Sequence, residues 1–317
     1  MVDKRYLKGI KLVREIRMPL PTTEKQSEHE PIDTLSAQDA AAFMLRGQHL
    51  AIDAVSRVAH EIDKGAQAMA AAIRSDNAII YSAAGSSGLM AFADACELHG
   101  TFGIPQAKIQ IHMAGGVPAD GRMPGGTEDD TQAGEAIAGS IKNGDVVIVL
   151  SASGTTPYAV AVAKFAKKQG ATVIAIANNP ATDLLALADI AICLETPPEV
   201  IAGSTRLGAG TAQKAALNLM SSLMGIRLGH VHQGLMVNVV AENAKLMQRS
   251  VGIVAQVADV TEAAAQLALE QTAEQTKPAI LVAAGCTPGA AMELLVAYDG
   301  HLGRCLQSLK SNQDMNV

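Results

Sequence analysis

The segment Val146-Val147-Ile148-Val149-Leu150, followed at once by Ser151-Ala152-Ser153-Gly154-Thr155-Thr156-Pro157, decides the fold of this chain. Five aliphatic residues without polar alternation are typical of a strand that is buried on both faces, as in a parallel sheet. A run of Ser, Thr and Gly that ends in Pro is typical of a turn into a helix, because Pro suits the first helical turn. A helical stretch, Pro157 to Lys168, follows. This part of the chain is therefore predicted to form one strand–loop–helix unit.

The same order of elements recurs through the middle of the chain. Further apolar runs predict four more strands, at Ala78–Ala83, Lys108–His112, Val173–Ala177 and Ile190–Leu194. Helical stretches such as Leu89 to Leu98 separate most of these runs. Buried strands that alternate with helices predict an α/β fold with a doubly wound parallel sheet.

The flanking regions are predicted to be helical or extended. A helical stretch from Ser36 through Ile73 is predicted to have Ser36 as its N-cap, and further helices are expected over Thr211–Gly225 and Val237–Arg249. A turn at Gly285–Gly289 divides a smaller helical unit near the C-terminus. We therefore expect three parts: an N-terminal arm (residues 1–35), the α/β domain (36–250) and a helical subdomain (251–317).

The composition excludes several classes of protein. Of the 317 residues, 49% are hydrophobic and 18% are charged, so the chain can build a core and has no disorder signature. There is no Trp, and only four Phe and four Tyr, so aromatic platforms for single-stranded nucleic acid are lacking. A net charge of −6 also argues against binding to a phosphate backbone. We expect no nucleic-acid partner.

The cysteines and the apolar runs point to a cytoplasmic protein. The four cysteines, at Cys96, Cys193, Cys286 and Cys305, are scattered without a CxxC spacing, which indicates a reducing compartment. The N-terminus has basic residues but no apolar stretch behind them, so no secretory signal is predicted. The apolar run from Ala66 to Ile73 is too short to span a bilayer, and we expect no membrane association.

Loops that follow the strands are the candidate ligand site, because ligands of parallel sheets bind beyond the carboxyl ends of the strands. The loops Ala84–Gly88 and Ser151–Pro157 each supply hydroxyls and free N–H groups at the start of a helix, which is what a phosphate requires. Ala202–Arg206 is a third loop of this kind. None of them is a Walker A or a GxGxxG motif, and ordinary strand-to-helix turns have a similar composition.

Two carboxylates stand out by position, Glu97 in a helix and Glu128 in a glycine-rich loop. In one cleft they could form an acid/base pair, although their spacing alone favours two solvated surface residues. His230 and His232 would share one face of a strand, but no third ligand accompanies them, so we expect no metal. Lys245 and Glu242 are interpreted as a solvated pair on a late helix.

With these motifs, the chain resembles the N-acetylmuramic acid 6-phosphate etherases of the sugar isomerase (SIS) domain group. The resemblance covers most of the chain from about Thr23. It rests on five ordered motifs: Ala84–Gly88 with Asp94–Glu97, Ala114–Gly116 with Gly126–Asp129, Ser151–Tyr158, Gly203–Arg206 with Ala209–Lys214, and Leu235–Val240 with Asn243–Leu246. The resemblance implies a SIS-type, flavodoxin-like sheet with a helical C-terminal subdomain.

The resemblance also implies an activity, that of a carbon–oxygen lyase in peptidoglycan recycling. The family removes lactate from carbon 3 of a cytoplasmic amino-sugar 6-phosphate, without metal or organic cofactor, and forms homodimers with sites near the subunit interface. By this resemblance Glu97 and Glu128 are the acid/base pair that serves proton removal from carbon 2 and water addition. The expected substrate-binding residues are Ser86, Ser87, Ser151, Ser153, Thr155, Thr156, Ser204 and Thr205.

The chain departs from the family at three basic positions. The family usually has Arg at the positions of Leu89 and Thr155 and Lys at the position of Gly208, and the Asn of its Thr-Glu-x-x-Asn stretch is missing after Thr23-Glu24. Each lost cation would remove about 1–3 kcal/mol of binding if it contacts the substrate. We therefore expect lyase chemistry on N-acetylmuramic acid 6-phosphate, or on a related amino-sugar phosphate that lacks or differs in the lactyl carboxylate. The alternatives are an aldose–ketose isomerase and a non-catalytic phosphosugar sensor.

Overall fold

Five parallel strands form the central sheet of this computed structural model, which describes residues 21–26 and 31–314. The order is β2-β1-β3-β4-β5, each neighbouring pair being parallel. The strands are β1 (Ile79–Ala83), β2 (Ile109–Met113), β3 (Val146–Ser151), β4 (Thr172–Ala177) and β5 (Ile190–Cys193). All five predicted strands and the α/β fold are confirmed. Most of the predicted N-terminal arm, residues 1–20 and 27–30, lies outside the described residues.

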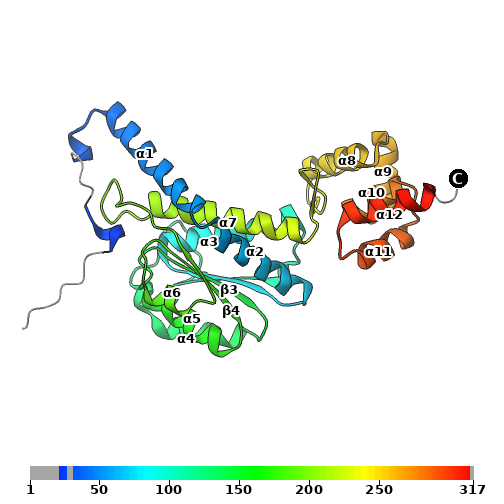
Figure 1. Cartoon of the computed structure of the whole chain (residues 1–317). Coiled ribbons are helices and arrows are strands. Elements are labelled where there is room, and N and C mark those ends of the chain that lie inside the picture. The colour runs from blue at the N-terminus through cyan, green and yellow to red at the C-terminus, as the bar shows by residue number, and fades with distance from the viewer. Residues whose placement is uncertain (1–20, 27–30, 315–317) are drawn as a thin grey trace, which may run out of the picture.

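Helices cover both faces of the sheet (Figure 1). One face carries α1 (Ala37–Ser56), α2 (Ala59–Arg74), α3 (Gly85–Phe102) and α7 (Gly208–Arg227). The other carries α4 (Thr131–Ala136), α5 (Pro157–Lys168) and α6 (Asp183–Leu187). Short 3₁₀ helices lie at η1 (Thr22–Glu24), η2 (Ile32–Thr34), η3 (Gln106–Lys108), η4 (Thr127–Asp129) and η5 (Ile137–Ser140).

Each central strand contributes alternate side chains to two separate cores. In β3, Ile148 packs into the core under α1, α2, α3 and α7, whereas Val147 and Val149 face α5. Burial on both faces explains why these strands are unbroken aliphatic runs. Small residues allow the helices to pack closely: Gly65 of α2 lies directly against Met220 of α7, with no room for a Cβ atom.

The N-terminal helical stretch consists of two helices. Ser36 caps α1 as predicted, since its side chain accepts a hydrogen bond from the backbone N–H of Asp39. The stretch then breaks at Arg57–Val58, where Val58 leaves the helical region of φ and ψ before α2 begins. Helix α3 starts earlier than predicted, because the loop Gly85–Gly88 itself forms its first turn.

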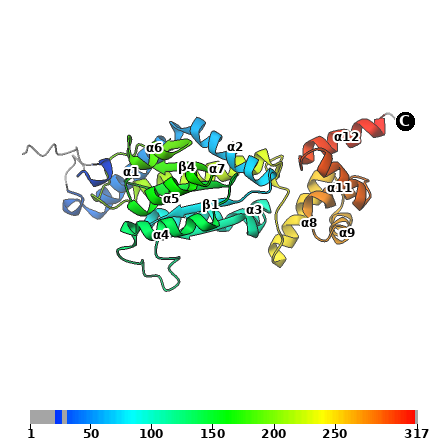
Figure 2. The same cartoon turned by 90° about the horizontal axis from the view of Figure 1, so that it is seen from below.

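A second unit of short helices lies beyond the end of the sheet domain (Figure 2). A hairpin of β6 (Val231–His232) and β7 (Leu235–Met236) leads to α8 (Ala244–Ala258), α9 (Glu262–Gln271), α10 (Thr276–Ala283), α11 (Pro288–Ala297) and α12 (Leu302–Asp314). These helices share a third core. The turn predicted at Gly285–Gly289 separates α10 from α11.

The helix predicted over Val237–Arg249 is wrong in its first half. Residues 237–243 are not helical, and α8 begins only after Asn243, whose side chain caps it. Val237 and Val239 are instead buried in the third core, which suits an extended segment of β-branched residues. Glu242 therefore precedes the helix and pairs with His99 (3.5 Å) rather than with Lys245. The predicted domain boundary after residue 250 falls inside α8, and we propose that the helical unit begins near Val237.

Within the described ranges, no single helix has the length and hydrophobicity needed to cross a membrane. The pair α10 and α11 reaches that length and composition only jointly, with a bend of 115° between them.

Candidate active site

A cavity of about 320 Å³ opens where β1 and β3 end and α3 and α5 begin. It lies at the carboxyl edge of the sheet, which is where ligands of open parallel sheets bind. Its lining is mostly hydroxyl and carboxylate side chains with small residues between them: Glu24, Ala84, Ser86, Ser87, Glu128, Ser151, Ala152, Ser153, Thr156, Gly203 and Thr205. All three predicted loops therefore meet at one place.

The loop before α5 is tied together by its own hydroxyls. The Oγ of Ser151 lies 2.8 Å from Oγ1 of Thr156 and 3.2 Å from Oγ of Ser153, and it accepts a hydrogen bond from the N–H of Gly154. Pro157 occupies the first turn of α5 as predicted, and Thr156 is the N-cap without a side-chain capping bond. The hydroxyls and the N-terminus of the helix thus face the same cavity, as anion binding requires.

The first turn of α3 forms the opposite wall. Ala84 is its N-cap and has no side chain able to cap the helix, so the first N–H groups of α3 lack a side-chain acceptor. Ser86 and Ser87 of this turn line the cavity. Two helix N-termini with four serines and one threonine therefore converge on a space large enough for a phosphate and part of a sugar.

Glu128 comes into the cavity on η4, in the loop that follows β2. Gly126 starts this 3₁₀ turn with φ of +70°, a conformation that favours glycine. The loop folds over Gly115, where a Cβ atom would lie 2.7 Å from side-chain atoms of Pro124 and Thr127. The Oε1 atom of Glu128 then lies beside Gly85, the first residue of α3.

Glu97 does not line this cavity in the single chain. It is exposed on α3, eleven positions beyond Ser86, which corresponds to about 16 Å along the helix axis. Its neighbour Asp94 is buried, with 4% exposed, and accepts hydrogen bonds from Tyr81 (2.8 Å), Asn218 (2.7 Å) and Ser221 (2.9 Å). The pairing of Glu97 with Glu128 in one chain is therefore not observed.

Three other residues predicted to bind the substrate differ in whether they line the cavity. Thr205 lines the cavity, whereas Ser204 and Thr155 do not. Both the N–H and the hydroxyl of Thr155 donate to Oγ of Ser153, so Thr155 supports the loop from outside.

The cavity lining contains no lysine or arginine among the described residues. At the third of the family's basic positions, Gly208 is the first residue of α7, and its N–H donates to Oε2 of Glu199 at 2.8 Å. Ala209 donates to the other oxygen at 2.9 Å. Burial raises the pKa of Glu199, and these two backbone hydrogen bonds partly oppose the shift.

Sequence reasoning missed two residues at this site. Glu24 reaches the cavity from η1, more than sixty positions before the nearest predicted residue, and Asn179 holds η1 in place. One signal in the sequence was Thr23-Glu24, which matches the beginning of the family's Thr-Glu-x-x-Asn stretch. The residues around this pair give no indication that the segment docks beside the sheet.

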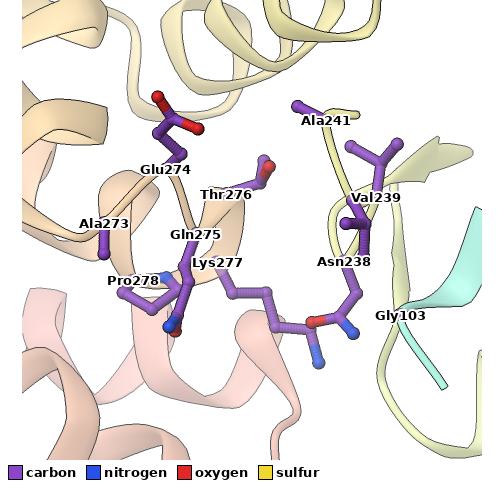
Figure 3. A pocket seen from close by; sticks show the side chains of 11 residues that line it. Gly103, Asn238, Val239, Ala241, Ala273, Glu274, Gln275, Thr276, Lys277 and Pro278 are labelled. Carbon is purple, nitrogen blue, oxygen red and sulfur yellow. The ribbon is translucent and has the colours of Figure 1, made fainter. Parts of the chain in front are cut away.

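A second cavity, of about 360 Å³, lies between the sheet domain and the helical unit. Figure 3 shows Lys277 extending from α10 toward Asn238 on the connecting segment. Lys277 is 5% exposed and donates to the carbonyl of Gly300 at 2.8 Å, and burial lowers its pKa to about 8. This cavity lies away from the strand ends and has no cluster of hydroxyls, so it does not fit the predicted chemistry.

The two histidines of the hairpin also lie between the two units. His230 lies 3.5 Å from the side-chain amide of Asn238, and the ring of His232 lies next to Gly303. Across residues 21–26 and 31–314, no group of three or more His, Cys, Asp or Glu side chains is arranged to hold a metal ion.

Comparisons with known proteins show which family this chain belongs to. A family model described as the SIS domain matches residues 46–178. The chain is 37% identical over 279 residues to an N-acetylmuramic acid 6-phosphate etherase of Salmonella typhi, covering 87% of this chain and 94% of that protein. A relative of the same name from Salmonella schwarzengrund (strain CVM19633) is 36% identical over 306 residues, covering 93% and 98%.

Among solved structures, a phosphoheptose isomerase from Francisella tularensis is similar at 17% identity and a TM-score of 0.44, covering 61% of this chain and 98% of that one. The sequence identity to the etherases extends over nearly the full length of both chains. This chain belongs to the N-acetylmuramic acid 6-phosphate etherase family.

Proposed function

We propose that this protein is a carbon–oxygen lyase that cleaves the lactyl ether of N-acetylmuramic acid 6-phosphate, giving N-acetylglucosamine 6-phosphate and lactate. The observation that carries the proposal is the combination, in one cavity, of a hydroxyl-lined cradle at two helix N-termini with the carboxylate of Glu128. Two alternatives, an isomerase and a sensor, are not favoured, because the relatives that match over nearly the full length are named etherases.

The phosphate group would rest between α3 and α5. Ser86 and Ser87 lie on one side, and Ser151, Ser153 and Thr156 on the other. Hydroxyl and N–H donors together with two helix dipoles can hold a phosphate without a cation. Since no lysine or arginine of the described residues lines the cavity, we expect weaker phosphate binding than in a site with arginine.

The reaction needs a carboxylate near carbons 2 and 3 of the sugar. In the open-chain form the aldehyde acidifies the proton on carbon 2, and a carboxylate removes it. The bond between carbon 3 and the lactyl oxygen then breaks, and lactate leaves with the electron pair. Water adds to carbon 3 of the resulting alkene while a proton returns to carbon 2, so that substrate and water give the two products. Neither step consumes an oxidant or a reductant.

Glu128 and Glu97 are the proposed acid/base groups. Since Glu97 lies about 16 Å along α3 from the cavity of its own chain, the pair requires Glu97 from a second copy. Exposed apolar side chains on the adjacent helices α1 and α7, including Leu45, Leu50, Ile52 and Ile226, support such a homodimer. Each active site would then be completed by the α3 helix of the partner.

We place this activity in the cytoplasm, within peptidoglycan recycling. All four cysteines are free in the structure, as suits a reducing compartment.

The deciding experiment is an assay of lactate released from N-acetylmuramic acid 6-phosphate by the wild type, Glu97→Gln and Glu128→Gln. We expect release by the wild type and a loss of about a hundredfold or more in each variant. Tight binding of the sugar phosphate without lactate would favour the sensor, and ketose formation from hexose phosphates would favour the isomerase.

A further inference from the structure

The described N-terminal segment, residues 21–26, brings a second carboxylate, in addition to that of Glu128, into the cavity. Glu24 ends the 3₁₀ turn η1 and is one of the cavity-lining residues. Its Oε2 atom lies 3.5 Å from the position that a Cβ atom of Gly203 would occupy, so it lies beside the loop Gly203–Thr205 at the cavity wall. Within a single chain, the cavity therefore contains two carboxylates, Glu24 and Glu128.

The position of Glu24 is held by the residues before it. The N–H of Thr22 donates to Oδ1 of Asn179 at 2.7 Å, and Nδ2 of Asn179 donates to Oγ1 of Thr23 at 3.1 Å. The N–H of Gly203 donates to the carbonyl of Thr23 at 3.2 Å. Thr23 is only 2% exposed. The segment is thus docked by its backbone and by Thr23, which leaves the side chain of Glu24 free for another role.

The same asparagine joins this segment to the phosphate loop. Nδ2 of Asn179 also donates to the carbonyl of Ala152 at 3.0 Å, between Ser151 and Ser153. A single buried side chain therefore sets the position of η1 relative to the loop before α5. Asn179 therefore links the segment that carries Glu24 to the loop that carries Ser151 and Ser153.

The chemistry of Glu24 suits the sugar and not the phosphate. A carboxylate repels a phosphate but accepts hydrogen bonds from hydroxyl and amide N–H groups. No Lys, Arg or His forms an ion pair with Glu24 in the part of the chain that the structure describes. No aromatic residue lines the cavity there, so a sugar would depend on hydrogen bonds and not on stacking.

We propose that Glu24 is a substrate-binding residue whose carboxylate accepts hydrogen bonds from hydroxyl or acetamido N–H groups of the amino sugar. This proposal rests on the proposed function in taking a sugar phosphate as the ligand of the cavity. It adds a contact at the sugar end, opposite the hydroxyls that hold the phosphate.

The test measures binding and needs no turnover. Isothermal titration calorimetry of the full chain compares two probes, N-acetylglucosamine 6-phosphate and inorganic phosphate. For Glu24→Ala we expect the Kd of the sugar phosphate to rise about tenfold to a hundredfold. The Kd of inorganic phosphate should stay unchanged or fall, since a negative charge is removed. Glu24→Gln, which keeps one acceptor oxygen, should lie between the wild type and Glu24→Ala for the sugar phosphate.

Two controls separate a contact from a structural role. Asp33→Asn changes an exposed acid of the neighbouring turn η2 and should leave both Kd values unchanged. Asn179→Ala removes the docking bonds and should lower the melting temperature and weaken both probes. A Glu24→Ala variant that behaves like Asn179→Ala, or that binds the sugar phosphate as the wild type does, would overturn the proposal.

Glucose 6-phosphate identifies the hydrogen-bond donor, because it lacks the acetamido group. If Glu24→Ala weakens binding of N-acetylglucosamine 6-phosphate alone, the donor is the N–H group, and if it weakens binding of both sugars, the donor is a hydroxyl. Unchanged binding of both sugars overturns the proposal.

In the lactate assay, Glu24→Ala should raise KM by a similar factor with kcat changed less than about threefold. If the wild type releases no lactate, the etherase function fails while the binding result for Glu24 still stands.

Discussion

Gly85 and Glu128 occupy a space that has no room for one further carbon atom: a Cβ atom on Gly85 would lie 2.6 Å from Oε1 of Glu128. Gly85 also has a φ of +55°, in the left-handed region that favours glycine. The proposed acid/base group therefore reaches the cavity because the first residue of α3 has no side chain. Gly85 therefore both allows the turn after β1 and leaves room for the carboxylate of Glu128.

Gly85→Ala should abolish most of the activity while the protein stays folded. The new methyl group displaces the carboxylate of Glu128, and the positive φ costs about 1 kcal/mol of stability. We expect kcat to fall about a hundredfold in the lactate assay. Gly100→Ala is the matched control in the same helix, since a Cβ atom there meets no atom within 4 Å. Equal activity of the two variants would contradict the assigned role of Glu128.

A complementation assay tests whether each site is shared between two copies. Glu97→Gln and Glu128→Gln are each expected to be inactive, but unfolding and refolding them together should restore about one quarter of wild-type activity. Half of the dimers would be mixed, and one of the two sites in each mixed dimer would have both glutamates. Activity that stays at the level of the separate variants would indicate that the two residues do not act across an interface.

The network around Asp94 should be important for stability. Asp94→Ala leaves Tyr81, Asn218 and Ser221 without their buried acceptor, so we expect the free energy of unfolding to fall by about 2–4 kcal/mol in urea titrations. Tyr81→Phe removes one of these bonds and should cost about 0.5–1.5 kcal/mol. Burial, followed by the charge of Asp94, raises the pKa of Tyr81 well above its usual value. Similar losses in both variants would mean that Asp94 does not organise the network.

Acidification should destabilise the region between the two units. Burial, followed by the charge of Lys277, lowers the pKa of His230 to about 3. The charges of His301 and Arg74 add smaller effects in the same direction, and a hydrogen bond with the backbone of Phe102 opposes the shift. Between this value and about 6.5, the unfolded chain binds more protons at this position than the folded chain does. Stability therefore falls as the pH drops below about 6.5.

Thermal unfolding measured between pH 7 and pH 5 checks this expectation. His230→Gln should show a smaller decrease of the melting temperature with falling pH than the wild type. His60→Gln, which changes an exposed histidine on α2, should keep the wild-type slope. An unchanged slope in His230→Gln would show that His230 does not titrate in this way.

Local sequence was sufficient wherever the determining interactions are short in range. An unbroken run such as Val146–Leu150 can be satisfied only by burial on both faces, so a strand of this kind was predictable from the chain alone. The loop before α5 was equally predictable, because Pro157 and the hydroxyl residues that bind one another lie within seven positions. Val237–Val240 was wrongly predicted as helix because a short apolar run is compatible with both a helix and a strand. Burial in the core of the helical unit favours the extended conformation that is observed.

The amino-acid sequence by itself determined the parallel sheet, the helix N-termini that form the phosphate cradle and, through its motifs, the etherase family. Only the tertiary structure decided which carboxylates share the cavity. Glu128 lies beside Gly85, and Asn179 holds the segment that carries Glu24, while Glu97 does not line the cavity of its own chain. Strand and turn propensities act over a few residues, whereas the meeting of Glu24 with residues as distant in sequence as Ser86 and Thr205 depends on how the whole chain packs.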